Sequence, residues 1–180
     1  MDLISQVLLL HASLDAAGVP HAFGGALALA YWTAEPRGTR DIDCNVFVSA
    51  TLSEGVLAAL PSGVDVPPGT AGVIAKAGQV RLWWGETPLD LFFDYAPLHK
   101  AAAAGARRVP LAGTDIPVLG PVELVLFKAL FDRTKDWADV EAVLAAGSTS
   151  AAEVEPALAA LVGADDPRLA RLAEAARRAH

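Results

Sequence analysis

The sequence FGGALALAYWTAEPRGTRDIDCNVFV, residues 23–48, holds a glycine pair, a helix-forming stretch and two aspartates at the start of a hydrophobic run. Such a run is typical of a buried β-strand, where like charges are unfavourable unless something binds them. Because side chains alternate between the faces of a strand, Asp41 and Asp43 share one face. Their backbone positions lie about 7 Å apart, close enough for both side chains to reach one cation.

A third carboxylate lies in a similar setting further along the chain. Asp90 has Leu and Phe neighbours in TPLDLFFD, residues 87–94, where an unpaired buried carboxylate would be costly. Asp94 shares its face but lies nearer the strand end, where we expect solvent. With Asp41 and Asp43, Asp90 would complete an all-oxygen donor set, which suits Mg²⁺ or Mn²⁺ better than zinc.

The glycine pair, Gly24 and Gly25, lies between a short expected strand and a helix. Glycines let the backbone approach a ligand closely, and the N–H groups and dipole at a helix start favour an anion. A glycine pair before a helix is often only a turn, and Asp41 with Asp43 is open to interpretation as a solvated strand start. Together, one helix apart, they predict a phosphate-binding turn and a metal site at one edge of a sheet.

Composition limits the class of protein. The chain has 180 residues, 53% hydrophobic and 19% charged, which predicts a packed globular protein of about one domain. The net charge of −7 argues against a broad surface for duplex DNA, and Arg107 and Arg108 are expected to be solvated rather than an RNA contact. With Cys44 alone, no intramolecular disulfide or cysteine-based zinc site can form, and a cytoplasmic protein without a membrane segment is expected.

The order of expected elements predicts an α/β class, with a small mixed sheet flanked by helices and a helical C-terminal part. We place a boundary near residue 119, between an α/β core at residues 1–119 and a helical subdomain at residues 120–180. Helices are expected at residues 3–17, 26–32, 51–60 (capped by Thr51 or Ser53), 97–104, 121–135, 136–147, 151–163 and 166–180. Strands are expected at residues 21–23, 41–48, 79–85, 89–95 and in a hairpin over 107–119, and a loop at residues 62–72.

Three segments carry a resemblance to a known family: GGALALAYWTAEPRGTRDID, then LDLF, then FKALFDRTKDWADV. They resemble the DNA polymerase beta-like nucleotidyltransferase superfamily, and within it the small AbiEii-type enzymes related to toxin and abortive-infection proteins. The resemblance implies two divalent metals and transfer of a nucleoside monophosphate from an NTP to an acceptor hydroxyl. Many members have Gly-Ser where this chain has Gly24 and Gly25, so a hydroxyl to the phosphates is missing here.

The resemblance also implies roles for single residues. Asp41 and Asp43 correspond to the metal-binding pair. Asp90 corresponds to the third carboxylate, which holds a second metal and helps to deprotonate the acceptor. The nucleotide-binding set is Gly24, Gly25, Thr39, Arg40, Lys128, Asp136 and Asp139, and Arg40 is preferred to Arg37 as a phosphate contact.

The helical stretch after residue 121 has charged residues at helical spacing. Those at i, i+4, i+7 and i+11 are Lys128, Asp132, Lys135 and Asp139. One interpretation is a ladder of exposed ion pairs, each contributing a few tenths of a kcal/mol. The other, suggested by the resemblance, is that Lys128 contacts the triphosphate while Asp136 or Asp139 orients Lys128 or the base.

The acceptor stays open among the 3′ end of a tRNA, a protein hydroxyl and a small molecule. A toxin-like role would bring a cognate antitoxin or partner protein. One alternative is a nucleotide-binding or regulatory module that keeps the fold without turnover. Another is a structural partner protein that docks through its alanine-rich helices after residue 148.

Overall fold

The computed structural model describes residues 1–35, 38–94 and 97–179. The chain forms two compact units, the first of residues 1–27 with 38–119 and the second of residues 28–37 with 120–180. The division falls inside helix α2 (Gly25–Thr33), so residues 28–37 group with the C-terminal helices.

The first unit contains a mixed seven-stranded sheet in the order β3-β4-β5-β2-β1-β7-β6. Strand β2 pairs antiparallel with β1 and parallel with β5, and β1 pairs parallel with β7. This arrangement puts β2 and β5 side by side in the middle of the sheet. The strands are β1 (His21–Phe23), β2 (Ile42–Ser49), β3 (Val64–Asp65), β4 (Gln79–Trp84), β5 (Thr87–Asp94), β6 (Arg107–Leu111) and β7 (Thr114–Val118).

Alternation along β5 shows why these residues form a strand with one core face. Leu89, Leu91 and Phe93 are fully buried, whereas Asp90 and the other residues between them are half-buried. On β2, the alternate residues Ile42, Cys44 and Val46 are buried in the same core. The carboxylates therefore lie on the opposite face of the sheet from the apolar core.

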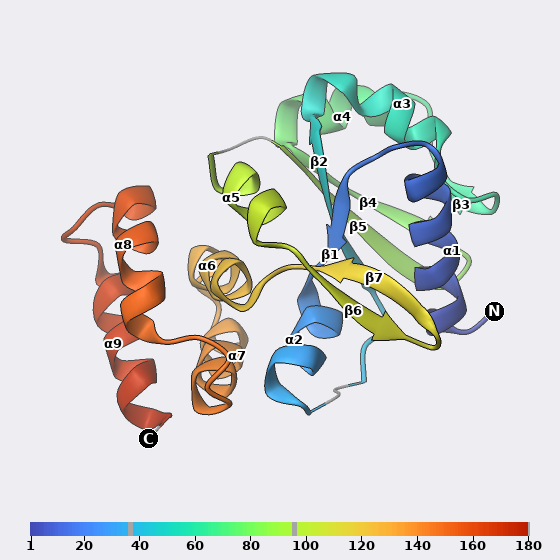
Figure 1. Ribbon diagram of the computed structural model, residues 1–180. Helices are drawn as coiled ribbons and strands as arrows, with labels where there is room; N and C mark the ends of the chain where they lie inside the picture. The colour runs from blue at the N-terminus through green and yellow to red at the C-terminus, as the bar shows by residue number, and fades with distance from the viewer. Residues whose placement is uncertain (36–37, 95–96, 180) are drawn as a thin grey trace. The chain divides into compact units, whose positions relative to one another are not determined.

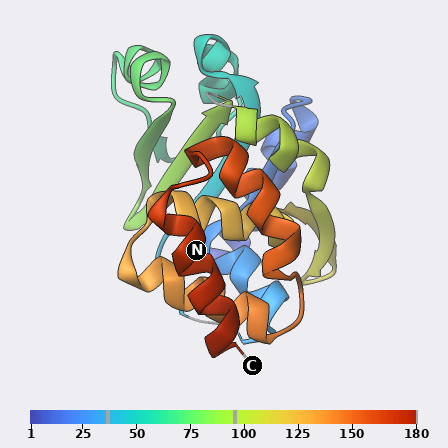
Figure 2. The same cartoon turned by 90° about the vertical axis from the view of Figure 1, so that its left-hand side faces the viewer.

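The helices of the first unit flank this sheet. Figure 1 shows α1 (Leu3–Ala16) along one side of the sheet and α5 (Pro97–Gly105) along the other, and Figure 2 agrees. Asp2 caps α1 by accepting a hydrogen bond of 2.8 Å from Ser5 N. From α1, the Gln6 side chain donates to Trp84 O at 3.2 Å and accepts from Thr87 Oγ1 at 2.8 Å, which ties α1 to the β4–β5 hairpin.

Two parts of the first unit differ from the sequence-based expectation. The expected loop at residues 62–72 contains β3 and the start of α4 (Thr70–Ala77), which follows Gly69 without a side-chain cap and so lacked a start signal. The helix expected at residues 51–60 is a 3₁₀ turn, η1 (Ala50–Leu52), followed by α3 (Ser53–Ala58). Its expected caps are also wrong, because Ser49 accepts the hydrogen bond from Thr51 N and α3 has no side-chain cap.

The second unit is helical. Figure 2 shows α8 and α9, coloured orange to red, lying side by side. Ser150 and Glu153 form a capping box at α8, and Asp166 with Pro167 starts α9 as expected. The helices after residue 120 are α6 (Pro121–Phe131), α7 (Thr134–Ala145), α8 (Ala151–Val162) and α9 (Pro167–Arg178).

The helical stretch expected over residues 121–135 is broken. Helix α6 ends at Phe131, and Asp132 adopts a left-handed conformation with φ 57° before α7 begins at Thr134. Asparagine and aspartate tolerate this conformation better than most residues with a side chain. The one-face ladder that the spacing predicted is therefore wrong.

The predicted fold class is confirmed, because a mixed sheet is flanked by helices and followed by further helices. Within the described ranges, none of the helices has the length and apolar character needed to span a bilayer.

Candidate active site

Two of the three predicted carboxylates are neighbours across the middle of the sheet. Asp43 on β2 and Asp90 on β5 are register partners on paired parallel strands. Neighbouring strands lie about 4.8 Å apart, and partners in register project from the same face. The pairing therefore places two like charges side by side, an arrangement that needs a cation or another compensating charge.

Asp41 lies just before β2, two residues from Asp43. Its Oδ1 accepts a short hydrogen bond from Thr39 Oγ1, and Asp41 N donates to the same hydroxyl at 3.4 Å. The structure thus shows Thr39 orienting Asp41, a role that the sequence analysis did not assign to it. Arg40 is exposed, and Arg37 lies outside the described residues.

Asp90 has a partner that the sequence analysis missed. Arg81 on β4 is its register partner on the other side, and the guanidinium binds the carboxylate through two bonds, Nε to Oδ1 at 2.8 Å and Nη2 to Oδ2 at 2.6 Å. The signal was available in principle, because the register of the β4–β5 hairpin brings these two residues together.

The three carboxylates match a divalent metal in the type of donor atom that they offer. Asp41, Asp43 and Asp90 offer only oxygen donors, the type that Mg²⁺ and Mn²⁺ take. Over residues 1–35, 38–94 and 97–179, however, no three acidic, histidine or cysteine side chains are grouped so as to hold an ion. The donors are of the right kind, and Asp43 and Asp90 are in register, while both oxygens of Asp90 are bound by Arg81.

The glycine pair lies in close contact with the Asp43 side chain. Gly25 has φ +51°, and a Cβ atom there would lie 1.8 Å from Asp43 Oδ2. A Cβ atom on Gly24 would lie 3.0 Å from Asn45 Nδ2 and 3.2 Å from Leu119 Cδ1. The Asp43 carboxylate therefore packs directly against the start of α2, in a space that a serine at position 25 would fill. This contact gives a physical reason for Gly-Gly instead of Gly-Ser.

A small cavity of about 40 Å³ adjoins this turn. It has room for only a few water-sized groups, so it is too small for a nucleotide. Asp41, Asp43, Thr39 and Gly24 line one part of it, and the remaining lining is apolar, including Phe23.

The thiol beside the carboxylates is not a candidate nucleophile. Cys44 is fully buried on the core face of β2. Burial, and secondly the charge of Asp43, raises the pKa of its thiol far above the ordinary value. Since the thiolate is the reactive form, Cys44 is a core residue.

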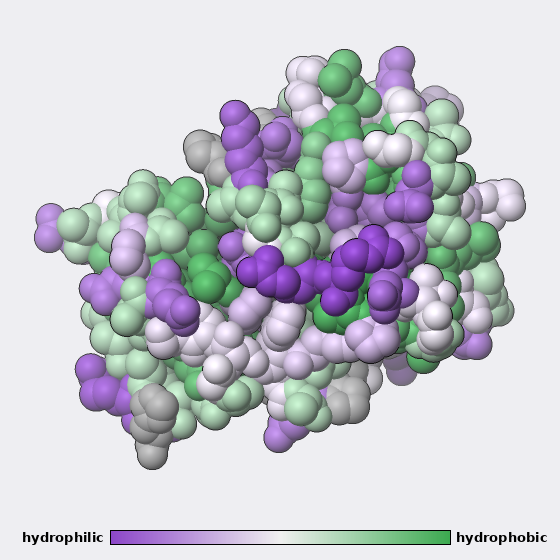
Figure 3. Space-filling model, in the orientation of Figure 1, coloured by the Kyte–Doolittle hydropathy of each residue, from purple (hydrophilic) through white to green (hydrophobic). Residues whose placement is uncertain are grey.

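The exposed arginines of β6 donate hydrogen bonds to backbone carbonyls, one at the end of α5 and one on β7. Arg107 donates to Gly105 O at 2.8 Å and Arg108 to Asp115 O at 2.6 Å. Figure 3 shows hydrophilic side chains gathered over this hairpin, where both arginines are exposed.

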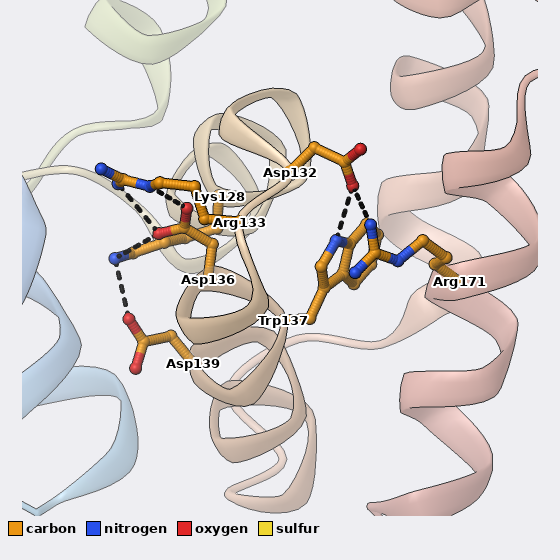
Figure 4. A network of polar contacts seen from close by, with 7 residues as sticks. All are labelled: Lys128, Asp132, Arg133, Asp136, Trp137, Asp139 and Arg171. Atoms are coloured by element: carbon orange, nitrogen blue, oxygen red, sulfur yellow. Dashed lines mark hydrogen bonds and ion pairs between the residues drawn. The ribbon is translucent and has the colours of Figure 1, made fainter.

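The second unit brings together the other predicted residues (Figure 4). Lys128 Nζ lies 2.8 Å from Asp139 Oδ2 and 3.3 Å from Asp136 Oδ1, and Arg133 Nε donates to Asp136 Oδ2 at 2.6 Å. The Asp136 side chain is completely buried. Burial acts to raise the pKa of Asp136, but hydrogen bonds from Arg133 and the charge of Lys128 outweigh it and hold the pKa below its ordinary value.

The break after α6 gives Asp132 a different partner from the one expected. Asp132 accepts from Trp137 Nε1 at 2.8 Å and pairs with Arg171, whose guanidinium lies 4.8 Å from the Trp137 ring centroid. Lys128 instead reaches across the corner to α7, and Lys135 is exposed. The predicted ladder of exposed pairs is thus replaced by a network that is largely buried at its centre.

Comparison with known proteins gives matches at the level of structure. No protein-family model matches the chain, and no curated protein matches its sequence. The antibiotic-resistance factor ANT(2'')-Ia, in complex with adenylyl-2''-tobramycin, aligns with a TM-score of 0.63 and 16% identity over 87% of this chain and 95% of that one. Its solution structure gives 0.58 and 15% identity, over 88% and 90%.

An antigenic nucleotidyltransferase-like protein from Paracoccidioides brasiliensis aligns with a TM-score of 0.57 and 17% identity, covering 94% of this chain and 92% of that one. At these identities the likeness establishes the fold and leaves the chemistry to the residues of this chain. The chain thus has the fold of nucleotidyltransferase structures.

Proposed function

We propose that this protein transfers a nucleoside monophosphate from an NTP to an acceptor hydroxyl. One observation carries the proposal: Asp43 and Asp90 are register partners on adjacent strands, and the Asp43 carboxylate lies against the glycine turn that starts α2. The acidic residues favour a bound cation, whereas the turn beside them favours a bound anion. A cation bound together with phosphates reconciles them.

The reaction would consist of an in-line displacement at the α-phosphorus. The acceptor oxygen forms a bond to this phosphorus, the bond to pyrophosphate breaks, and the hydroxyl proton passes to a carboxylate, for which Asp90 is proposed. Asp41 and Asp43 would hold Mg²⁺ or Mn²⁺, and Asp90 would help to hold a second such ion. When bound, the cation supplies positive charge that neutralises the phosphates and the leaving pyrophosphate.

The remaining proposed residues bind and orient the nucleotide. Gly24 and Gly25 allow the phosphates to approach the backbone, while Thr39 holds Asp41 in place and Arg40 is an exposed phosphate contact. In the second unit, Lys128 is proposed to meet the triphosphate. Asp136 and Asp139 would keep its ammonium group charged and oriented.

The acceptor is proposed to be a hydroxyl of a small molecule, a tRNA 3′ end or a protein. The complex of ANT(2'')-Ia with adenylyl-2''-tobramycin is an example of a small-molecule product in a protein with this fold. A toxin-like role with a cognate partner, and a cytoplasmic location that suits the single buried cysteine, are part of the same proposal.

The proposal is tested by thermal unfolding with each NTP, with and without Mg²⁺. A ligand that binds the native state raises its stability, so at least one NTP should raise the melting temperature only when Mg²⁺ is present. Asp43→Asn should abolish the shift, and the matched control Asp115→Asn, an exposed aspartate on β7, should keep it. No Mg²⁺-dependent shift with any NTP would overturn the proposal.

A second candidate function is nucleotide binding without turnover. The observation that favours it is the Arg81 guanidinium, which occupies both oxygens of the proposed general base. Pyrophosphate release separates the two functions. A transferase should release pyrophosphate with Mg²⁺, an NTP and fractionated acceptors, whereas a binding module should show the thermal shift and no release.

A further inference from the structure

We propose that Arg81 is a positioning residue that occupies Asp90 in the nucleotide-free protein and competes with a cation for this carboxylate. The inference rests on the proposed function, since it concerns the same carboxylates. It goes further by assigning a role to a residue that has no part in the reaction described above.

The geometry of the pair carries the inference. Both guanidinium bonds are of normal length, 2.8 Å and 2.6 Å, and they use both oxygens of Asp90. Bidentate pairs of this kind are the strongest side-chain hydrogen bonds to a carboxylate. A cation that binds the same oxygens must displace them.

Arg81 also lies in the field of the other carboxylates. Asp43, Asp90 and Arg81 form one row across β2, β5 and β4, because each is the register partner of the next. The hydrogen bonds and charge of Asp90, and after them the charges of Asp41 and Asp43, raise the pKa of Arg81 above its ordinary value. Arg81 is thus a resident cation among the three proposed metal ligands.

The two partners differ in their freedom to move. The Arg81 side chain is 54% exposed, whereas that of Asp90 is 15% exposed and lies on a central strand. The long arginine can swing out while Asp90 stays where it is.

Because Arg81 cancels the charge of Asp90, the charges left on Asp41 and Asp43 match a single divalent cation.

Release of Arg81 has a natural trigger in the proposed reaction. A triphosphate offers the guanidinium another set of oxygens with bidentate geometry and greater charge. Arrival of the nucleotide would therefore free Asp90 for a cation and for the acceptor proton. Cation and nucleotide should bind with positive coupling, and Arg81 should be the source of part of it.

The test uses Mn²⁺ binding followed by electron paramagnetic resonance of the free ion, in the full-length protein without nucleotide. Arg81→Gln should bind Mn²⁺ roughly tenfold more tightly than the wild type, because the charged guanidinium that competes with the ion for Asp90 is removed. The double variant with Asp90→Asn should lose this gain. The matched control Arg107→Gln removes the same charge from an exposed strand residue and should leave Mn²⁺ affinity unchanged.

Each outcome has a defined meaning. Equal Mn²⁺ affinity in Arg81→Gln, Arg107→Gln and the wild type, with the Mg²⁺-dependent thermal shift by an NTP intact, overturns the inference and leaves the proposed function standing. Absence of Mn²⁺ binding in every protein, together with no Mg²⁺-dependent thermal shift by any NTP, overturns the proposed function and the inference with it. Should Arg81→Gln not fold, Arg81→Lys keeps the charge but loses the bidentate geometry, and an unchanged affinity in it would also count against the inference.

Discussion

Replacing Gly25 by alanine should displace the Asp43 carboxylate and abolish cation-dependent nucleotide binding. The new Cβ atom would lie 1.8 Å from Asp43 Oδ2 and 2.6 Å from Asp43 Cγ, far inside van der Waals contact. Either the start of α2 or the aspartate must move. The aspartate is the softer of the two, because rotation of its side chain does not disturb the sheet.

The expected loss of stability has two parts. Alanine in a left-handed conformation costs about 1–2 kcal/mol, and crowding a packed site costs a further roughly 1–3 kcal/mol. Gly18 is the matched control, since its φ of +66° is similar and a Cβ atom there meets nothing within 4 Å. Gly18→Ala should therefore show the first part alone.

Urea unfolding of both variants measures the difference in their free energies of unfolding. Thermal shifts with Mg²⁺ and NTPs measure whether the site still binds a nucleotide. Gly18→Ala should keep the nucleotide-dependent shift, while Gly25→Ala should lose it. Gly25→Ser should behave like Gly25→Ala, because the same Cβ atom displaces Asp43 and a restored hydroxyl cannot compensate. Equal destabilisation of Gly18→Ala and Gly25→Ala, together with an unchanged shift in the latter, would refute this reasoning.

Two further predictions concern buried charges and histidines. Asp136→Asn removes the charge that pairs with Lys128 in a buried contact, and it should lower the free energy of unfolding by about 3–5 kcal/mol. The control Glu174→Gln, in an exposed pair of α9, should change this free energy by less than about 1 kcal/mol. Denaturant titration of both variants measures the difference. Burial lowers the pKa of His11 and His21 below 6.5, so the unfolded chain takes up more protons as the pH falls. The free energy of unfolding should be at its full value above that pH and decline below it, which unfolding at pH 7.5 and 5.5 measures. The double variant His11→Gln and His21→Gln should lose this decline. An unaltered decline in the variant would show that these two histidines are not its cause.

Local patterns were sufficient for most of the elements. Alternation in TPLDLFFD indicated a strand with one core face, and Asp166 followed by Pro167 indicated the start of α9, because these signals depend on neighbours in the chain. Helix α4 has no such signal, since it starts after Gly69 without a capping side chain. The end of α6 was missed for a similar reason, because no glycine or proline marks the break, where Asp132 is left-handed and Arg133 is extended.

The local sequence also indicated the carboxylates as site residues, because two aspartates at alternate positions of an apolar strand are rarely placed there without a compensating charge. The tertiary structure decided which groups they meet. Strand pairing set Asp43 beside Asp90 and Arg81 beside Asp90, and the turn at Gly25 set the helix start against Asp43. Alternation is a property of one strand, whereas register and side-chain contact depend on residues far apart in the chain, and those long-range pairings are fixed only when the sheet has formed.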